Sequence, residues 1–203
     1  MGSSLRLYTT GRGLFLSVTE VLKVIGKPYL DNWRHRIGRE DADIVLRNAA
    51  EFGTKLHGAA QKVAWREPVE AEIEPYAAAV RAFLDKHVLE VLGTEVELVN
   101  PDLRFGGTLD LYCQLKDGTY AVVDYKTTAQ LTREHGLQLA AYALLCRKHD
   151  LRVNRRLAVR VKKNRPGEFY VRQYEDHQED VQAFLGLLEF WLWRHRAAVG
   201  RAS

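Results

Sequence analysis

Two aspartates and a lysine stand in neighbouring extended segments of the chain, and together they supply the side chains that metal-assisted hydrolysis needs. Asp110 ends the segment 107 to 110, and Asp124 and Lys126 flank Tyr125 in the next extended segment. Because side chains alternate along a strand, Asp124 and Lys126 share one face. Carboxylates hold Mg²⁺ or Mn²⁺, which polarises a phosphate and lowers the pKa of water, and a nearby ammonium stabilises developing charge. These residues predict hydrolysis of a phosphodiester.

Three further polar residues have the right types to extend such a site. Gln138 and Tyr142 are four residues apart in a predicted helix, so they share a face and can donate hydrogen bonds to phosphate oxygens or orient the lysine and carboxylates. His57, from the first half of the chain, could add an imidazole to the metal ligands. Each has a structural alternative: Tyr142 lies among leucines and alanines and could be core, and a lone histidine often caps or packs a helix.

The elements that must position these residues alternate between strand and helix in the second half of the chain. The predicted hairpin that carries both aspartates turns at residues 116 to 118. The expected elements are strands over 94 to 100, 103 to 115 and 119 to 126, a helix over 133 to 149, strands over 155 to 163 and 168 to 174, and a helix from Asp176.

The first half is predicted to be mainly helical after a small hairpin over residues 5 to 16 around Gly11 and Gly13. Ser17 and Glu20 form a capping box that opens a helix ended by Gly26. The later helices are expected over 41 to 65, interrupted or bent at Gly53, and over 75 to 92.

This order of elements predicts an α/β fold with a mixed central sheet flanked by helices. We expect one domain over 1 to 203: a mainly helical part (5 to 92), a catalytic sheet and helix (93 to 176) and a C-terminal helix (177 to 203).

Composition sets limits on the class of protein without naming one. The 203 residues are 46% hydrophobic with five prolines, which argues against disorder. No run approaches the roughly 18 apolar residues of a membrane span, and no secretory signal is visible, so we expect a cytoplasmic protein without a membrane partner. Two cysteines are too few for an iron-sulfur cluster. The net charge of +4 suits a polyanionic partner but identifies nothing.

Taken in order, these motifs resemble the PD-(D/E)XK nucleases, and within them the RecB-type branch. The resemblance runs from about residue 14 to 195 and rests on four motifs, each of them weak alone. The segment 15 to 22 and Trp33 are also similar to the start of mitochondrial genome-maintenance exonucleases, which act on single-stranded DNA ends. The four motifs that carry the resemblance are His57, Gly107 to Asp110, Asp124 to Lys126, and Gln138 to Tyr142.

The resemblance implies a restriction-endonuclease-like core and a role for each motif. His57, Asp110 and Asp124 would bind Mg²⁺ or Mn²⁺ with the backbone carbonyl of Tyr125, and Lys126 would be catalytic. Gln138 and Tyr142 would form the helix motif of the site. Two features differ from many relatives: the iron-sulfur cysteines are missing, and no helicase region is present, which suggests a stand-alone enzyme.

Basic residues outside these motifs are candidates for contact with DNA. We expect Lys55, Lys162 and Lys163, together with Gln138 and Tyr142, to bind the nucleic acid. The two lysines near residue 162 belong to a basic stretch from 152 to 165, and charged strand edges also guard against aggregation, so both interpretations stay open.

The leading expectation from the resemblance is a metal-dependent exonuclease on single-stranded DNA ends, acting in replication, recombination or repair. Two alternatives remain: a structure-directed endonuclease, and an inert nucleic-acid-binding module of the same fold. The intact Asp110, Asp124 and Lys126 argue against the inert module, and the lack of a visible recognition domain weakens strict sequence specificity.

Overall fold

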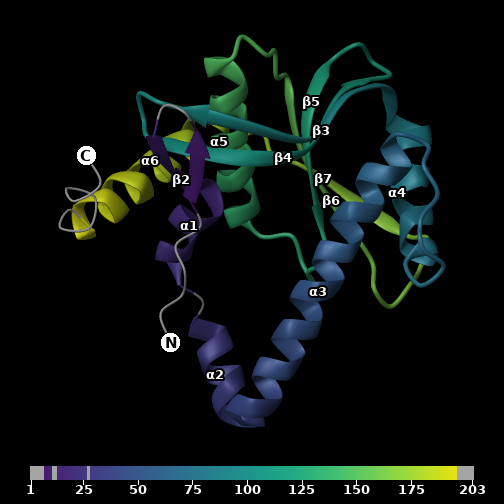
Figure 1. The fold of residues 1–203 in the computed structure, drawn as a ribbon, viewed down its shortest axis with the longest axis horizontal. Coiled ribbons are helices and arrows are strands. Elements are labelled where there is room, and N and C mark those ends of the chain that lie inside the picture. The colour runs from purple at the N-terminus through teal and green to yellow at the C-terminus, as the bar shows by residue number, and fades with distance from the viewer. Residues whose placement is uncertain (1–6, 11–12, 27, 196–203) are drawn as a thin grey trace.

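A computed structural model describes residues 7–10, 13–26 and 28–195 of the chain. Within these ranges a short hairpin and a run of helices precede a second half in which strands and helices alternate (Figure 1). They are β1 (Leu7–Thr10), β2 (Gly13–Ser17), α1 (Val18–Leu22), the 3₁₀ turn η1 (Lys23–Ile25), α2 (Pro28–Ile37), α3 (Arg39–Ala64), α4 (Glu74–His87), β3 (Val88–Asn100), β4 (Phe105–Leu115), β5 (Tyr120–Lys126), α5 (Arg133–Lys148), β6 (Arg155–Val161), β7 (Phe169–Gln173) and α6 (His177–Arg194).

The strands of the described residues form one mixed sheet in the order β1-β2-β4-β5-β6-β7, with β3 paired to β4. The pairs β3–β4, β4–β5 and β6–β7 are antiparallel, whereas β5–β6 and the short β2–β4 pair are parallel. The crossover from β5 to β6 runs through α5, as parallel neighbours require. The predicted mixed sheet flanked by helices is therefore confirmed.

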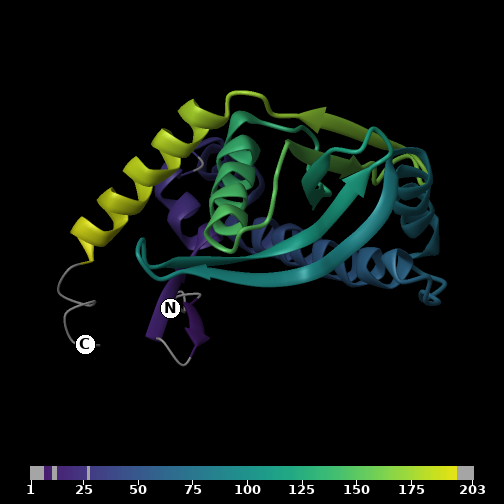
Figure 2. The ribbon, with the colours of Figure 1, turned by 90° about the horizontal axis from the view of Figure 1, so that it is seen from above.

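Helices cover both faces of the sheet and enclose two hydrophobic cores (Figures 1 and 2). One core lies beneath α1, α5 and α6 and includes Phe105, Leu139 and Phe184. The other lies beneath α3 and α4 and includes Phe83 and Tyr125. Since burial of apolar area is the dominant favourable term in folding, these cores fix the helices on the sheet.

At Asp110, successive side chains of β4 change from one hydrophobic core to the other. Leu109 packs in the α5 core and Leu111 in the α3–α4 core, although two residues apart in a regular strand would share a face. In the neighbouring β3, Glu95 stands opposite and has a φ of 49°. The β3–β4 pair is thus kinked at Glu95 and Asp110. On either side of the kink the two strands remain paired.

Most predicted elements are present, with two corrections in the first half. Residues 88 to 92 belong to β3 and not to the preceding helix, because β3 extends to pair along the whole of β4. α3 runs without interruption through Gly53, since a single glycine weakens a helix without ending it. The Ser17 side chain accepts the Glu20 backbone N–H at 3.1 Å, as the capping motif predicted. Of the expected N-terminal hairpin, Gly11 and residues 5, 6 and 12 lie outside the described residues.

Candidate active site

The site forms where β5 separates from β4. The two strands pair from Leu111 and Val123 toward their connecting turn, and the ladder stops before Asp110 and Asp124. The backbone N–H of Tyr125, which lacks a β4 carbonyl there, instead donates to the Asp110 carboxylate at 2.7 Å. A wedge therefore opens between two central strands, and the side chains at its mouth come from both.

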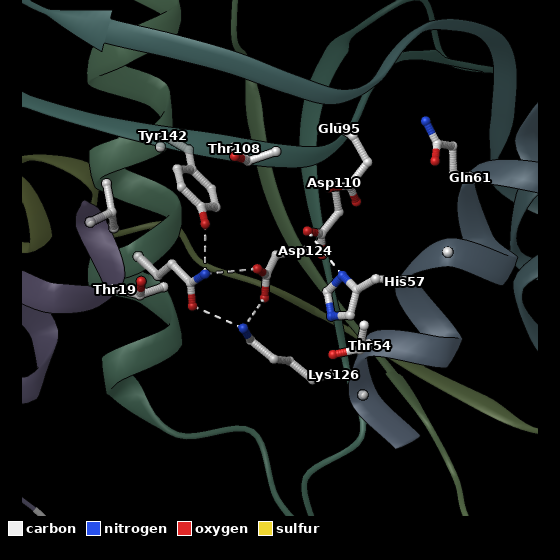
Figure 3. Close-up of a pocket in the computed structure, with 15 residues that line it drawn as sticks. Thr19, Thr54, His57, Gln61, Glu95, Thr108, Asp110, Asp124, Lys126 and Tyr142 are labelled. Atoms are coloured by element: carbon white, nitrogen blue, oxygen red, sulfur yellow. Dashed lines mark hydrogen bonds and ion pairs between the residues drawn. The ribbon is translucent and has the colours of Figure 1, made fainter. Parts of the chain in front are cut away.

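The wedge opens into a cavity of about 490 Å³. Its floor comes from β3, β4 and β5, and its walls come from α1, α3 and α5 (Figure 3). The residues that line it are Val18, Thr19, Gly53, Thr54, His57, Gly58, Gln61, Glu95, Gly107, Thr108, Asp110, Asp124, Lys126, Gln138 and Tyr142.

Lys126 is held at the cavity by a closed set of contacts. Its Nζ lies 2.6 Å from Asp124 Oδ2 and donates to Gln138 Oε1 at 2.9 Å. The Gln138 amide completes the ring by donating to Asp124 Oδ1 at 3.0 Å, and it also lies 2.8 Å from the Tyr142 hydroxyl (Figure 3). An ammonium held by a carboxylate and an amide has little rotational freedom, so its charge is fixed in place.

Asp124 is buried, with only 1% of its surface exposed. Burial raises the pKa of its carboxyl to about 6, and the charge of Asp110 acts in the same direction. Lys126 and His57 oppose this shift but do not cancel it. A buried carboxylate that is not fully compensated is a favourable place for a further cation.

His57 approaches the same region from α3. Its Nδ1 lies 3.1 Å from Asp110 Oδ1, whereas the Tyr125 N–H binds the other oxygen, Oδ2 (Figure 3). Burial lowers the pKa of the imidazole, but the hydrogen bond to Asp110 and the charges of Asp110 and Asp124 outweigh it, so the net pKa is raised. α3 can deliver this side chain because Leu56 and Ala60, on its buried face, pack on the sheet.

Glu95 joins this group, and it was missed at the sequence level. Ligand atoms of His57, Glu95 and Asp110 all lie within 4.8 Å of one another. Glu95 belongs to no recognisable motif, and it reaches the site because the kinked β3 places it opposite Asp110. Counting the antiparallel register back from the turn at residues 101 to 104 would have paired the two, since Asn100 aligns with Phe105.

Close contact between β4 and α5 brings the helix motif to the strands. A Cβ on Gly107 would come within 2.7 Å of the Tyr142 ring and 3.2 Å of Leu145. Only glycine lets the helix approach so closely at this position. Gln138 therefore reaches Asp124 and Lys126 on β5 directly, and the Tyr142 hydroxyl, one turn along α5, meets the Gln138 amide.

The structure brings together most of the predicted site residues: Asp110, Asp124, Lys126, Gln138, Tyr142 and His57 all line the cavity. The Tyr125 side chain instead packs in the α3–α4 core, edge-on to Phe83, so only its backbone faces the wedge. Its carbonyl as a metal ligand stays a prediction.

The three predicted DNA-binding lysines lie outside the cavity. Lys55 pairs with Glu72 at 2.9 Å, and Lys162 pairs with Glu168 at 2.7 Å. Lys163 lies 4.5 Å from the centre of the Phe52 ring, and partial burial lowers its pKa. The structure does not bring these lysines to the site, because oppositely charged or aromatic neighbours hold them elsewhere.

The family model of the PD-(D/E)XK nuclease superfamily matches residues 49–192, which is more than half of the chain. The chain belongs to the PD-(D/E)XK nuclease superfamily. The matched range contains His57 and the strand and helix motifs of the site. No curated protein matches the chain, and the similarity of residues 15 to 22 to mitochondrial exonucleases stays a prediction.

Two solved structures resemble the fold at low sequence identity. One, described as the crystal structure of SSO0001, is 15% identical with a TM-score of 0.48 and covers 90% of this chain and 76% of that one. The other, LHK-Exo in complex with dAMP, is 16% identical with a TM-score of 0.42 and covers 93% and 95% of the two chains.

A membrane-spanning role finds no support in the helices. Within the residues that the structure describes, none of them has the length and apolar character that crossing a bilayer requires.

Proposed function

We propose that the chain is a metal-dependent deoxyribonuclease that shortens single-stranded DNA from its ends. The observation that carries this proposal is the joining of two groups in one cavity: the Lys126–Asp124–Gln138 ring and the His57–Glu95–Asp110 cluster. The first group fixes a positive charge, and the second offers hard ligands for a divalent cation.

The residues present fit a divalent cation. Glu95, Asp110 and Asp124 bring three carboxyl groups to the cavity, against the single ammonium of Lys126. His57, Asp110 and Asp124 would hold the ion, as the family resemblance implies, and the position of Glu95 makes it a further candidate ligand. When bound, Mg²⁺ or Mn²⁺ would polarise the phosphodiester and lower the pKa of water beside it.

The side chains have distinct roles in this proposal. Lys126 stabilises the negative charge that develops on the attacked phosphate, and Asp124 with Gln138 fixes the direction of its ammonium. Gln138 is itself fixed by its contact with the Tyr142 hydroxyl. Asp110 orients His57 and binds the Tyr125 N–H, so it joins α3 to the strand wedge.

Preference for a single strand is supported by the surroundings of the site. The reactive groups lie at the floor of a cavity walled by α1, α3 and α5, so a phosphate must come down between helices to reach them. A single strand can enter such a space, whereas a duplex, about twice as wide, meets the walls. Entry of a strand from its free end makes an exonuclease the favoured form.

The proposal is tested with end-labelled linear DNA and covalently closed circles, both single-stranded, in Mg²⁺, Mn²⁺ or excess chelator. We expect shortening of linear strands only, dependence on the cation, and little attack on blunt duplex. Circular strands cut as fast as linear ones would make the chain an endonuclease. Binding without cleavage in any cation would make it an inert module of the same fold.

A further inference from the structure

A second concave surface adjoins the loop of residues 127 to 132, which leads from Lys126 to α5. It has a volume of about 330 Å³. Two loop residues, Gln130 and Leu131, form one side of it. The other side comes from β6 and β7 and consists of Arg160, Tyr170 and Arg172, which we call the β6–β7 platform.

The platform is continuous with the active site through the sheet. Lys126 aligns with Arg160 in the parallel β5–β6 pair, and Arg160 aligns with Tyr170 in the antiparallel β6–β7 pair. Aligned residues on neighbouring strands point to the same face. Since strands lie about 4.8 Å apart, the backbone of Tyr170 is about 10 Å from that of Lys126.

Both arginines of the platform are held in place from one side. Arg160 donates through Nη1 to the carbonyl of Ala129, and Arg172 donates through Nη1 to the carbonyl of Leu131 at 2.8 Å. A guanidinium has five N–H donors in one plane, so a single such bond fixes its position without using all of them. The loop thereby orients two positive charges, those of Arg160 and Arg172, at the second concave surface.

Tyr170 gives the platform an aromatic face. It is 50% exposed although it lies in a strand, and the Arg160 guanidinium lies 5.7 Å from the centre of its ring. The described residues that line this second concave surface include two arginines and no carboxylate. A half-exposed ring that lines one surface with two held guanidiniums is complementary to a nucleotide, which offers a flat base and an anionic phosphate.

We propose that Arg160, Tyr170 and Arg172 bind one nucleotide of the substrate strand outside the catalytic cavity. Tyr170 stacks on the base, and the two guanidiniums contact the phosphate. The inference rests on the proposed function, because it assigns a second contact to the strand whose phosphodiester lies at Lys126. Stacking tolerates any base, so the platform adds affinity and register without sequence specificity.

The test is binding of a fluorescent single-stranded oligonucleotide of about 12 nucleotides, measured by anisotropy in excess chelator so that no cleavage occurs. Tyr170→Ala should raise the Kd about tenfold, and Tyr170→Phe should leave it near the parent value because the ring remains. Trp193→Ala is the matched control, since it removes an exposed aromatic side chain from α6, away from the platform.

Two further measurements separate stacking from a general loss of structure. In the first, a single abasic site is placed at each position of the oligonucleotide in turn. At the position that meets Tyr170, no base remains to stack, so the parent and Tyr170→Ala should have the same Kd there. Arg172→Gln, which keeps an amide able to donate to Leu131, should reduce the slope of log Kd against log salt by about one.

The outcomes distinguish the platform from the function on which it rests. A parent protein that neither binds nor cleaves single-stranded DNA would refute the proposed function. Suppose that the parent binds and cleaves, and that the Kd of Tyr170→Ala equals the parent's on the intact oligonucleotide and at every abasic position. That result would refute the platform alone. An equal loss from Trp193→Ala would also refute it, since the effect would not depend on this surface.

Discussion

Lys126 and Asp124 are held together in a setting where neither is easily replaced. The lysine is 17% exposed and the aspartate 1%, so their 2.6 Å contact is largely shielded from water. Shielding strengthens the field of the ammonium at the cavity and makes its loss costly for a reaction that develops negative charge.

Removal of that charge gives the first prediction. Lys126→Ala should lower kcat by about 100-fold or more while unfolding remains a single cooperative transition. Lys148→Ala is the control, because Lys148 lies outside the cavity and makes an exposed pair with Asp102. Single-turnover cleavage with saturating enzyme measures the effect, and a near-normal rate for Lys126→Ala would place the catalytic charge elsewhere.

The raised pKa of Asp124 gives a prediction for pH. The carboxyl must lose its proton to bind a cation, and its pKa is about 6, against an ordinary value of 3.8. The raised pKa of His57 acts in the same direction, because only the neutral imidazole is a ligand. Affinity for Mn²⁺, measured by calorimetry, should therefore increase as the pH rises through about 6.

Asp124→Asn provides the matched comparison for this pH dependence. The amide does not titrate, so the part of the pH dependence that Asp124 contributes should vanish while that of His57 remains. An unchanged profile in Asp124→Asn would show that another group controls cation binding.

At the scale of elements, the site depends on how closely α5 approaches β4. The contact at Gly107 places the Tyr142 ring against the strand backbone, and the same helix carries Gln138 to Asp124 and Lys126. Displacement of the helix by even part of an ångström would stretch the hydrogen bonds that fix the lysine.

Gly107→Ala should therefore impair activity beyond its effect on stability. The new methyl group would meet Tyr142 at 2.7 Å, and overpacking of this kind costs about 1–3 kcal/mol. Gly186→Ala on α6 has nothing within 4 Å of the new Cβ and should stabilise the protein by about 0.5–1 kcal/mol. Urea unfolding and kcat are measured together; a Gly107→Ala enzyme with normal kcat would show that the helix can retreat without disturbing Gln138.

At the scale of the whole molecule, α6 is fixed to the sheet by a buried ion pair as well as by apolar contacts. Arg156 on β6 donates to Asp180 on α6 at 2.8 Å and to the carbonyl of Gly136 on α5 at 3.2 Å. Both charged side chains are less than a tenth exposed. One guanidinium thus joins two helices to β6, the strand next to β5.

Loss of the Asp180 carboxylate should lower the free energy of unfolding of the whole fold. Asp180→Ala leaves the Arg156 charge buried without its carboxylate and should cost about 3–5 kcal/mol of unfolding free energy. Glu179→Ala breaks only the neighbouring exposed pair with Arg133 and should cost about 1 kcal/mol or less. Equal midpoints for the two variants in urea would show that the buried pair does not stabilise the docking of α6.

The sequence alone was sufficient for the parts of the site that depend on local geometry. Asp124 and Lys126 share a face because strand side chains alternate, and Gln138 and Tyr142 share one because four residues make about one helical turn. These periods hold whatever the rest of the chain does. They made the hairpin that carries both aspartates, the following helix and the class of fold predictable, and the match to the nuclease superfamily agrees with them.

Tertiary structure decided the parts that depend on which distant segments meet. Three features follow from how the strands pair. They are the kink that turns Glu95 toward Asp110, the extension of β3 into residues 88 to 92, and the alignment of Lys126 with Arg160 and Tyr170. Register across a short turn can be counted from the sequence, as for Glu95 and Asp110, but the kink and the pairing of β5, β6 and β7 depend on which faces are buried against α3 and α5. For the same reason the partner of Lys55 was not predictable, since Glu72 belongs to the segment between α3 and α4, whereas Lys162 pairs locally with Glu168 across the β6–β7 turn.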